Sequence, residues 1–177
     1  MDTRIQQLQS LICSASSVHI NTQWLDYAGV VEYYPEELVM TVKAGTSIGQ
    51  IKEQLSLNQQ ALAFYTEDDS QSIGAVYAKG GQDISDSVLG VQIIDGNGEV
   101  LNFGGQVMKN VAGYDVARLL VGSAGQLAVV TQISFKVWPS HYLGQLVKPE
   151  QQSNSSQLRE QIEKKLKQVF DPKGIFE

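Results

Sequence analysis

One glycine-rich run constrains this chain more than any other stretch of its sequence. It reads FGGQVMKNVAGYD over residues 103–115 and continues as RLLVGSAG over residues 118–125. Glycine is used where φ must be positive or where the backbone must approach a ligand or another backbone closely, and five glycines fall in this run. We therefore expect something flat or charged, or a second backbone, to lie against this segment.

The composition is that of an ordinary globular protein, with 177 residues, 42% hydrophobic and 18% charged. The net charge of −6 and the scattered positions of the 13 Lys and Arg residues exclude nucleic acid as a partner. A single cysteine, Cys13, permits no internal disulfide, and we expect it to be at least half-buried. His19 and His141 have no Cys, Asp or Glu at ligand spacing, so we expect no metal site.

The sequence contains no stretch that indicates export or direct insertion into a membrane. Gln and Ser residues interrupt the apolar positions of the N-terminus, and the apolar run at residues 127–130 has only the length of a strand. We therefore expect a cytoplasmic protein whose contact with a membrane, if any, is peripheral or through a partner.

Hydrophobic spacing predicts the elements of the N-terminal part. Apolar residues recur at helical intervals over residues 5–12, and residues 29–33 and 38–43 have the Val and Tyr content of strands. Thr46 or Ser47 is suited to cap a following helix, whose apolar stripe is Ile48, Ile51 and Leu55.

Further elements follow the polar loop at residues 65–72. Residues 88–94 and 99–103 form a hairpin pattern around an Asn97-Gly98 turn, because Asn-Gly supplies positive φ angles. Residues 116–121 indicate a short helix that ends at Gly122. Residues 127–138 alternate as a long strand with one buried and one wetter face, which Pro139 stops.

These patterns divide the chain into four parts. We expect an N-terminal lobe at residues 1–64, a second α+β lobe at 65–139, a polar linker at 140–156, and a C-terminal helix and tail at 157–177. The apolar stripe of the terminal helix consists of Leu158, Ile162, Leu166 and Val169.

The glycine-rich run resembles the diagnostic segment of the flavin-binding subunits of bacterial glycolate oxidase, members of the vanillyl-alcohol oxidase family of PCMH-type FAD-binding proteins. Residues 29–33, 35–39, 44–46 and 86–91 share this resemblance, as does the closing FDPKGIF of residues 170–176. It implies an α+β, FAD-binding PCMH-type fold of two small α/β lobes with FAD between them, here in a truncated form that ends in a helix.

The resemblance also implies a function and partners. Members of the family oxidise glycolate or a related 2-hydroxy acid and pass electrons to a quinone. They work with a second flavin subunit and an iron–sulfur subunit, which implies a peripheral place at the inner membrane through those partners.

The cofactor residues that the resemblance implies lie mostly in the glycine-rich run. They are Gly74, Asn110, Val111, Gly113, Tyr114, Asp115, Gly122, Ser123, Gly125 and Val129. A purely structural explanation stays open, in which the glycines let a loop pack on the sheet and Asp115 caps the helix that starts at Val116.

The chain departs from the family pattern at three places that bear on the cofactor. Residues 18–25 contain no glycine where the family has a glycine-rich diphosphate loop, and Ala75 and Ala128 stand where the family has glycine. A polar linker replaces the family's substrate-side domain, and no catalytic set is recognisable. Two hypotheses follow: a subunit that binds FAD but is not catalytic alone, or a flavin-free relative that serves as a scaffold or assembly subunit.

Overall fold

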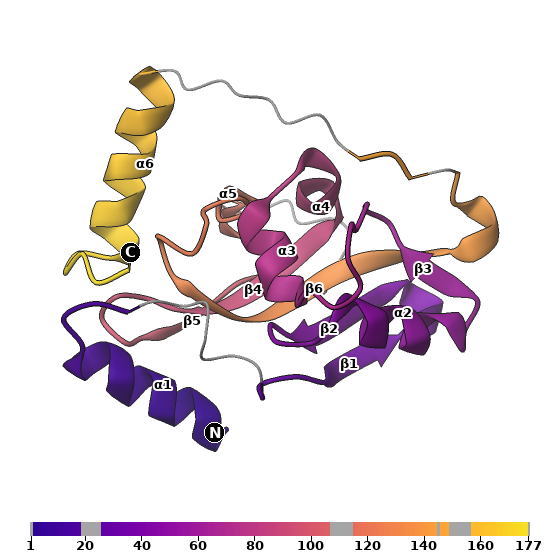
Figure 1. Ribbon diagram of the computed structural model, residues 1–177, viewed down its shortest axis with the longest axis horizontal. Helices are drawn as coiled ribbons and strands as arrows, with labels where there is room; N and C mark the ends of the chain where they lie inside the picture. Colours follow the sequence, from indigo (N-terminus) through magenta and orange to yellow (C-terminus); the bar gives the residue numbers. More distant parts are fainter. Residues whose placement is uncertain (1, 19–25, 107–114, 145, 149–156, 177) are drawn as a thin grey trace.

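The computed structural model describes residues 2–18, 26–106, 115–144, 146–148 and 157–176, with the backbone alone for residues 157–160. One antiparallel sheet organises these residues, with strand order β1-β2-β6-β4-β5, and β3 pairs with β6 outside that path (Figure 1). The described elements are α1 (Thr3–Ser14), β1 (Val30–Tyr34), η2 (Pro35–Glu37), β2 (Val39–Lys43), α2 (Ile48–Ser56), β3 (Gln60–Leu62), α3 (Ile73–Lys79), α4 (Gln82–Ser87), β4 (Val88–Ile94), β5 (Val100–Gly104), α5 (Val116–Leu119), β6 (Val129–Pro139), η3 (Ser140–Tyr142) and α6 (Gln157–Phe170).

Strand β6 lies at the centre of the sheet. It pairs with β2 on one side and β4 on the other, and its last residues pair with β3. Strands from residues 1–64 and from residues 65–139 therefore share one sheet. The division of the chain into two lobes at residue 65 stays a prediction.

The side chains of β6 alternate as expected, with one buried and one more accessible face. Ile133 and Phe135 belong to the larger core, on the face of the sheet that α3, α4 and α5 cover, whereas Val129 belongs to a second core on the opposite face, which α1 covers. The switch occurs at a bulge: Gln132 pairs with Gln92 and Val130 with Ile93, which leaves Thr131 without a register partner on β4. An extra residue in a strand exchanges the faces of the residues beyond it.

Two hydrophobic cores hold the sheet. Helices α3, α4 and α5 lie above the sheet in Figure 1, and the larger core is built from their apolar side chains together with those of α2. Helix α1 lies below the β4–β5 end, where Ile5, Leu8 and Ile12 pack against Ile94 and Val129. The chain's C-terminal residues Ile175 and Phe176 complete this second core.

Local signals account for the elements that were predicted. Asp2 caps α1 by accepting a hydrogen bond from the Arg4 amide, and Ser47 forms a capping box with Gln50 at the start of α2. The β4–β5 hairpin is confirmed, but its turn works differently: Gly98 has a positive φ of 83°, Asn97 does not, and the Asp95 carboxylate accepts from two amides of the turn.

Several expectations were wrong. Helices α3 and α4 were not anticipated, and the helix expected over residues 116–121 is the shorter α5. Cys13 is exposed, and its thiol donates to the Asn97 carbonyl at 3.4 Å. Helix α6 leaves Ile162 and Val169, two members of its expected stripe, 46% and 68% exposed.

Candidate functional site

Gly74 lies in the first turn of α3, pressed against the loop after β2. Its amide donates to the Ala44 carbonyl at 2.8 Å, and a Cβ atom at this position would lie 2.9 Å from the same oxygen. Close packing within the chain therefore already requires glycine here, whether or not a ligand binds.

The other amides at the start of α3 also have acceptors inside the protein. The Ile73 amide donates to the Thr46 carbonyl at 2.9 Å, and the Ala75 and Val76 amides donate to the Ser72 hydroxyl and carbonyl at 3.2 and 3.1 Å. A helix start can hold an anion only through amides that point at it. In this conformation the α3 amides are engaged elsewhere.

Asp115 caps α5, as the structural explanation of this residue predicts. Its carboxylate accepts a hydrogen bond from the Arg118 amide at 3.2 Å and lies 3.3 Å from the Arg118 guanidinium Nε. Both side chains are about half exposed, so the pair contributes little stability by itself.

The loop after α5 rests on the C-terminal end of α3. Gly122 and Gly125 have φ values of 79° and 78°, which favour glycine. The amides of Gly122 and Ala124 donate to the carbonyls of Tyr77 and Ala78, each at 3.0 Å. Since two hydrogen bonds fix this loop to α3, we call residues 120–127 the α3-bound loop.

Tyr77 ties α3 to α5 from within the core. Its side chain is fully buried, and its hydroxyl donates to the Ala117 carbonyl at 2.5 Å. Burial raises the pKa of the Tyr77 hydroxyl far above its ordinary value of 10.0, and the nearby Asp115 charge adds to this effect. Tyr77 therefore stays neutral and keeps its donor proton at physiological pH.

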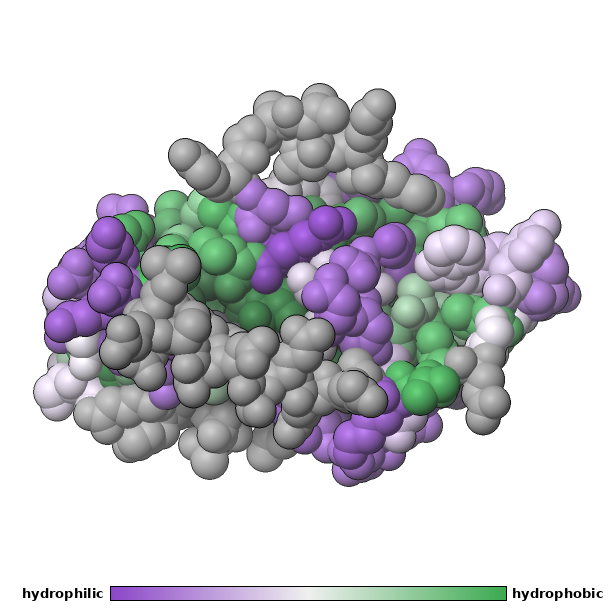
Figure 2. Space-filling model, turned by 90° about the horizontal axis from the view of Figure 1, so that it is seen from above, coloured by the Kyte–Doolittle hydropathy of each residue, from purple (hydrophilic) through white to green (hydrophobic). Residues whose placement is uncertain are grey.

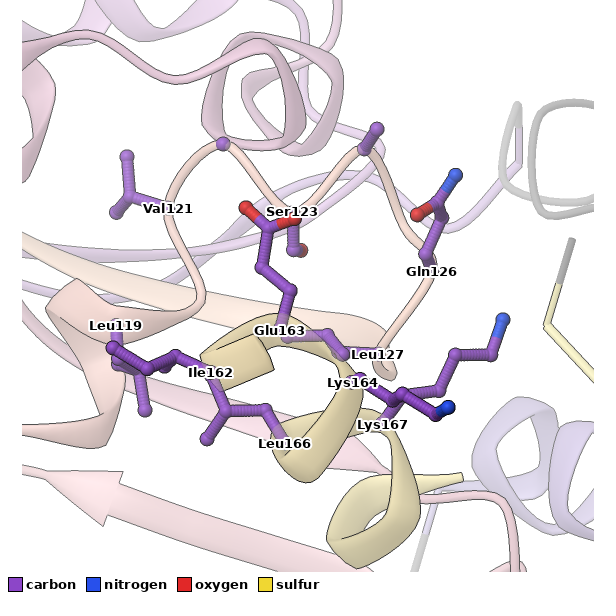
Figure 3. Close-up of a pocket in the computed structure, with 12 residues that line it drawn as sticks. Leu119, Val121, Ser123, Gln126, Leu127, Ile162, Glu163, Lys164, Leu166 and Lys167 are labelled. Atoms are coloured by element: carbon purple, nitrogen blue, oxygen red, sulfur yellow. The ribbon is translucent and has the colours of Figure 1, made fainter. Parts of the chain in front are cut away.

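A groove of about 650 Å³ separates the α3-bound loop from α6 (Figure 3). Apolar side chains make much of its wall, and the Glu163 side chain extends across it toward Ser123. Figure 2 shows hydrophobic residues gathered in a hollow on this side of the molecule. The groove is lined by Leu119, Val121, Gly122, Ser123, Ala124, Gln126, Leu127, Ile162, Glu163, Lys164, Leu166 and Lys167.

The structure brings together only some of the residues predicted to bind a cofactor. Gly122 and Ser123 line the groove, and Gly125 lies in the same loop. Gly74 lies at the opposite end of α3, and the Val129 side chain is buried in the second core. The predicted residues Asn110, Val111, Gly113 and Tyr114 lie outside the described residues.

Sequence reasoning did not foresee the groove, because its second wall is α6, more than thirty residues further along the chain. The described residues contain no group of three or more His, Cys, Asp or Glu side chains that could hold a metal. Within the same residues, no helix has the length and apolar character needed to cross a membrane.

The described loops fit an FAD only in part. Gly74 and Gly122 allow close approach of backbones, but the amides of Gly122, Ser123, Ala124 and Gln126 all donate to carbonyls within the protein. A diphosphate needs several hydrogen-bond donors directed at its oxygens. The described loops can fit closely around a flavin nucleotide, but the amides named above are not free to donate hydrogen bonds to its diphosphate.

The sheet, its covering helices and the glycine-rich turns define an α+β flavin-binding fold. The model of the family described as FAD binding domain matches residues 9–104, more than half of the chain, and the chain belongs to this family. The expected α+β, PCMH-type fold is thereby confirmed. A solved structure of alkyldihydroxyacetonephosphate synthase shares the fold, with a TM-score of 0.55 and 18% identity over 64% of this chain and 21% of that chain.

The relatives within this family include oxidoreductase subunits. The chain is 43% identical over 125 residues to the glycolate oxidase subunit GlcE of Escherichia coli, covering 64% of this chain and 35% of that subunit. It is 37% identical over 86 residues to the glycolate oxidase subunit GlcD of Bacillus subtilis, covering 49% and 17%. The predicted resemblance to glycolate oxidase subunits is confirmed, and the chain spans about a third or less of the length of these two relatives.

Proposed function

We propose that this chain is an FAD-binding subunit of a complex that oxidises a 2-hydroxy acid such as glycolate, and that it is not catalytic alone. The observation that carries the proposal is the 43% identity to GlcE over 125 residues. The chain's own elements supply a rigid sheet and tightly packed glycine turns, which support a flat ligand better than a flexible loop does.

FAD, when bound, would supply the redox chemistry by accepting a hydride from the substrate. The role of this chain would be to hold the nucleotide with Gly74 and the α3-bound loop, where Gly122, Ser123 and Gly125 lie. The oxidation would also need cationic groups for the substrate carboxylate and a base for its hydroxyl proton. In our proposal the partner subunits provide them.

The partners in this proposal are a second flavin subunit and an iron–sulfur subunit. We place the complex in the cytoplasm, peripheral to the inner membrane through those subunits. In this proposal the nucleotide lies between the two expected lobes, residues 1–64 and 65–139, and α3 belongs to the second of them.

A flavin-free scaffold is the second candidate, and one observation favours it. The amides at the start of α3 and in the α3-bound loop are already engaged inside the protein. A loop with satisfied donors must exchange those hydrogen bonds before it can hold a diphosphate, which weakens binding.

A flavin titration of the full chain separates the two candidates. We expect saturable quenching of flavin fluorescence at micromolar FAD, together with a perturbed visible spectrum. FMN is the matched control, because it carries the same ring system and one phosphate but lacks the adenosine monophosphate half of FAD. If FAD gives no quenching even at high concentration, the scaffold function replaces our proposal; if FAD and FMN bind equally, the assigned nucleotide-holding role of residues 122–125 is wrong.

A further inference from the structure

The groove between the α3-bound loop and α6 has two unlike ends (Figure 3). Leu119, Val121 and Ile162 line one end, and the side chains of Lys164 and Lys167 extend away from them at the other. The groove volume of about 650 Å³ falls within the range of about 300–1,000 Å³ that is typical of small-molecule sites. The groove is therefore suited to a ligand with one apolar end and one anionic end.

Two polar side chains lie between these ends. Glu163 extends from α6 across the groove toward Ser123 of the α3-bound loop (Figure 3). An ionised carboxylate accepts hydrogen bonds at both of its oxygens, and protein carboxylates bind the hydroxyl groups of ribose in this way. The middle of the groove thus offers an acceptor for a sugar that joins an apolar ring to a phosphate.

The anchoring of α6 holds its lysines beside the groove. Leu166 and Phe170 contact the larger core, and the Lys167 Nζ atom donates to the Phe176 carbonyl at 2.7 Å and lies 3.9 Å from the Asp171 carboxylate. An ammonium group has three N–H donors, so Lys167 keeps donors for an anion. Lys164 is exposed at the groove.

A diphosphate bound next to the α3-bound loop needs such side-chain donors. The amides of Gly122 and Ser123 already donate to carbonyls of the protein, and residues 18–25 contain no glycine. Hydrogen bonds from lysine to phosphate are charge-assisted and can replace backbone donors. Because α6 lies outside the residues 9–104 that the family model matches, the match to the family assigns no such role to its lysines.

We propose that the groove binds a nucleoside diphosphate group, with its diphosphate beside Lys164 and Lys167 and its ribose hydroxyls on Glu163. The flat base lies against the apolar end, at Leu119 and Ile162. In FAD this group is the adenosine diphosphate part, so its source in FAD rests on the proposed function. A free nucleotide such as ADP has the same chemistry, and the experiment distinguishes the two sources.

Isothermal titration calorimetry of the full chain without flavin tests this site, with ADP as the ligand and adenosine for comparison. We expect saturable ADP binding that weakens as salt rises, because the phosphate contact is ionic. Lys164→Gln should weaken ADP binding about tenfold or more and leave adenosine binding unchanged, since adenosine has no phosphate. Glu163→Ala should weaken adenosine binding about tenfold, because the ribose loses its acceptor.

Lys165→Gln is the matched control, because Lys165 is exposed on α6 and is not among the residues that line the groove. It should leave ADP binding unchanged. Lys164 is replaced rather than Lys167, because Lys167 also holds the Phe176 carbonyl. Circular dichroism establishes that each variant is folded. Absence of ADP binding, or equal losses for Lys164→Gln and Lys165→Gln, would overturn the proposal.

Competition between ADP and FAD identifies the source of the group. If ADP displaces FAD and Lys164→Gln weakens both, the groove holds the adenosine diphosphate part of FAD, as we expect. If ADP binds with the expected dependence on Lys164 and FAD does not bind, the groove is a site for a free nucleotide and the proposed function fails. If FAD binds and ADP neither binds nor displaces it, the proposed function stands and the groove is not the nucleoside diphosphate site.

Discussion

A Cβ atom on Gly80 would lie 2.7 Å from the Cα atom of Gly122. The turn after α3 and the α3-bound loop thus touch backbone to backbone, and neither can move away without breaking the bonds from Gly122 and Ala124 to α3. This contact fixes one wall of the groove.

Replacing Gly80 with alanine should therefore destabilise the protein strongly. The residue has a φ of 78°, and the added methyl group would strike the Gly122 backbone, so we expect a loss of about 2–4 kcal/mol in the free energy of unfolding. Urea denaturation measures it. Gly144→Ala is the control, since no atom lies within 4 Å of its added Cβ and its φ is not positive; equal losses for both would contradict the packing argument.

Tyr77→Phe should cost about 1–2 kcal/mol, because it leaves the buried Ala117 carbonyl without its donor. Thermal and urea unfolding at neutral pH measure this loss. Tyr142→Phe, at a side chain that is 71% exposed, should have almost no effect.

The same tyrosine should give the protein an alkaline limit. Burial raises the pKa of Tyr77 in the folded state above its value in the unfolded chain, so its stabilisation is complete below about pH 10 and declines as the pH rises further. Unfolding free energies measured from pH 8 to pH 11 should fall less steeply for Tyr77→Phe than for the wild type. Parallel curves would show that another group controls the alkaline range.

Asp171 holds the C-terminal tail in place. Its side chain is fully buried and accepts hydrogen bonds from the Ile175 and Phe176 amides at 2.9 and 3.0 Å. Asp171→Asn should lower stability by about 1.5–3 kcal/mol and speed hydrogen exchange at both amides. Asp68→Asn is the control, because the exposed Asp68 carboxylate also accepts a hydrogen bond from a backbone amide. This variant should leave both measurements nearly unchanged.

Ala75 and Ala128 should respond differently to glycine. Ala75 is exposed in the first turn of α3, so Ala75→Gly opens room for a ligand and should tighten FAD binding. Ala128 is 3% exposed within the larger core, so Ala128→Gly should lower stability without changing FAD affinity. Flavin titration and urea unfolding of both single variants check this; an unchanged affinity for Ala75→Gly would mean that steric approach does not limit binding.

Local sequence patterns were enough to predict the elements that interactions between neighbouring residues determine. The recurrence of Ile5, Leu8 and Ile12 predicts α1, and the alternation along β6 predicts a strand with unlike faces. Helix α3 was missed because it is short and contains Gly74, whose presence depends on Ala44, thirty residues away. No local pattern contains such a contact.

The candidate site was predictable in its residue types but not in its surroundings. The glycines of the α3-bound loop were identified from the sequence, whereas the acceptors of the Gly122 and Ala124 amides are carbonyls of α3 that only the tertiary structure brings near. The orientation of α6 was misjudged for a similar reason. Phe170 and the tail that follows it anchor the helix, and this anchoring, rather than its own apolar stripe, decides which side faces the core.

The central position of β6 has a consequence for the order of folding. It is the last strand of the sheet to be synthesised, yet β2, β3 and β4 all pair with it. On a growing chain, the β1–β2 and β4–β5 hairpins must therefore wait as separate pieces with open edges until residue 139 has emerged. Such long-range pairing slows folding and exposes strand edges to other chains. The nascent protein therefore needs a chaperone most while these edges are still unpaired.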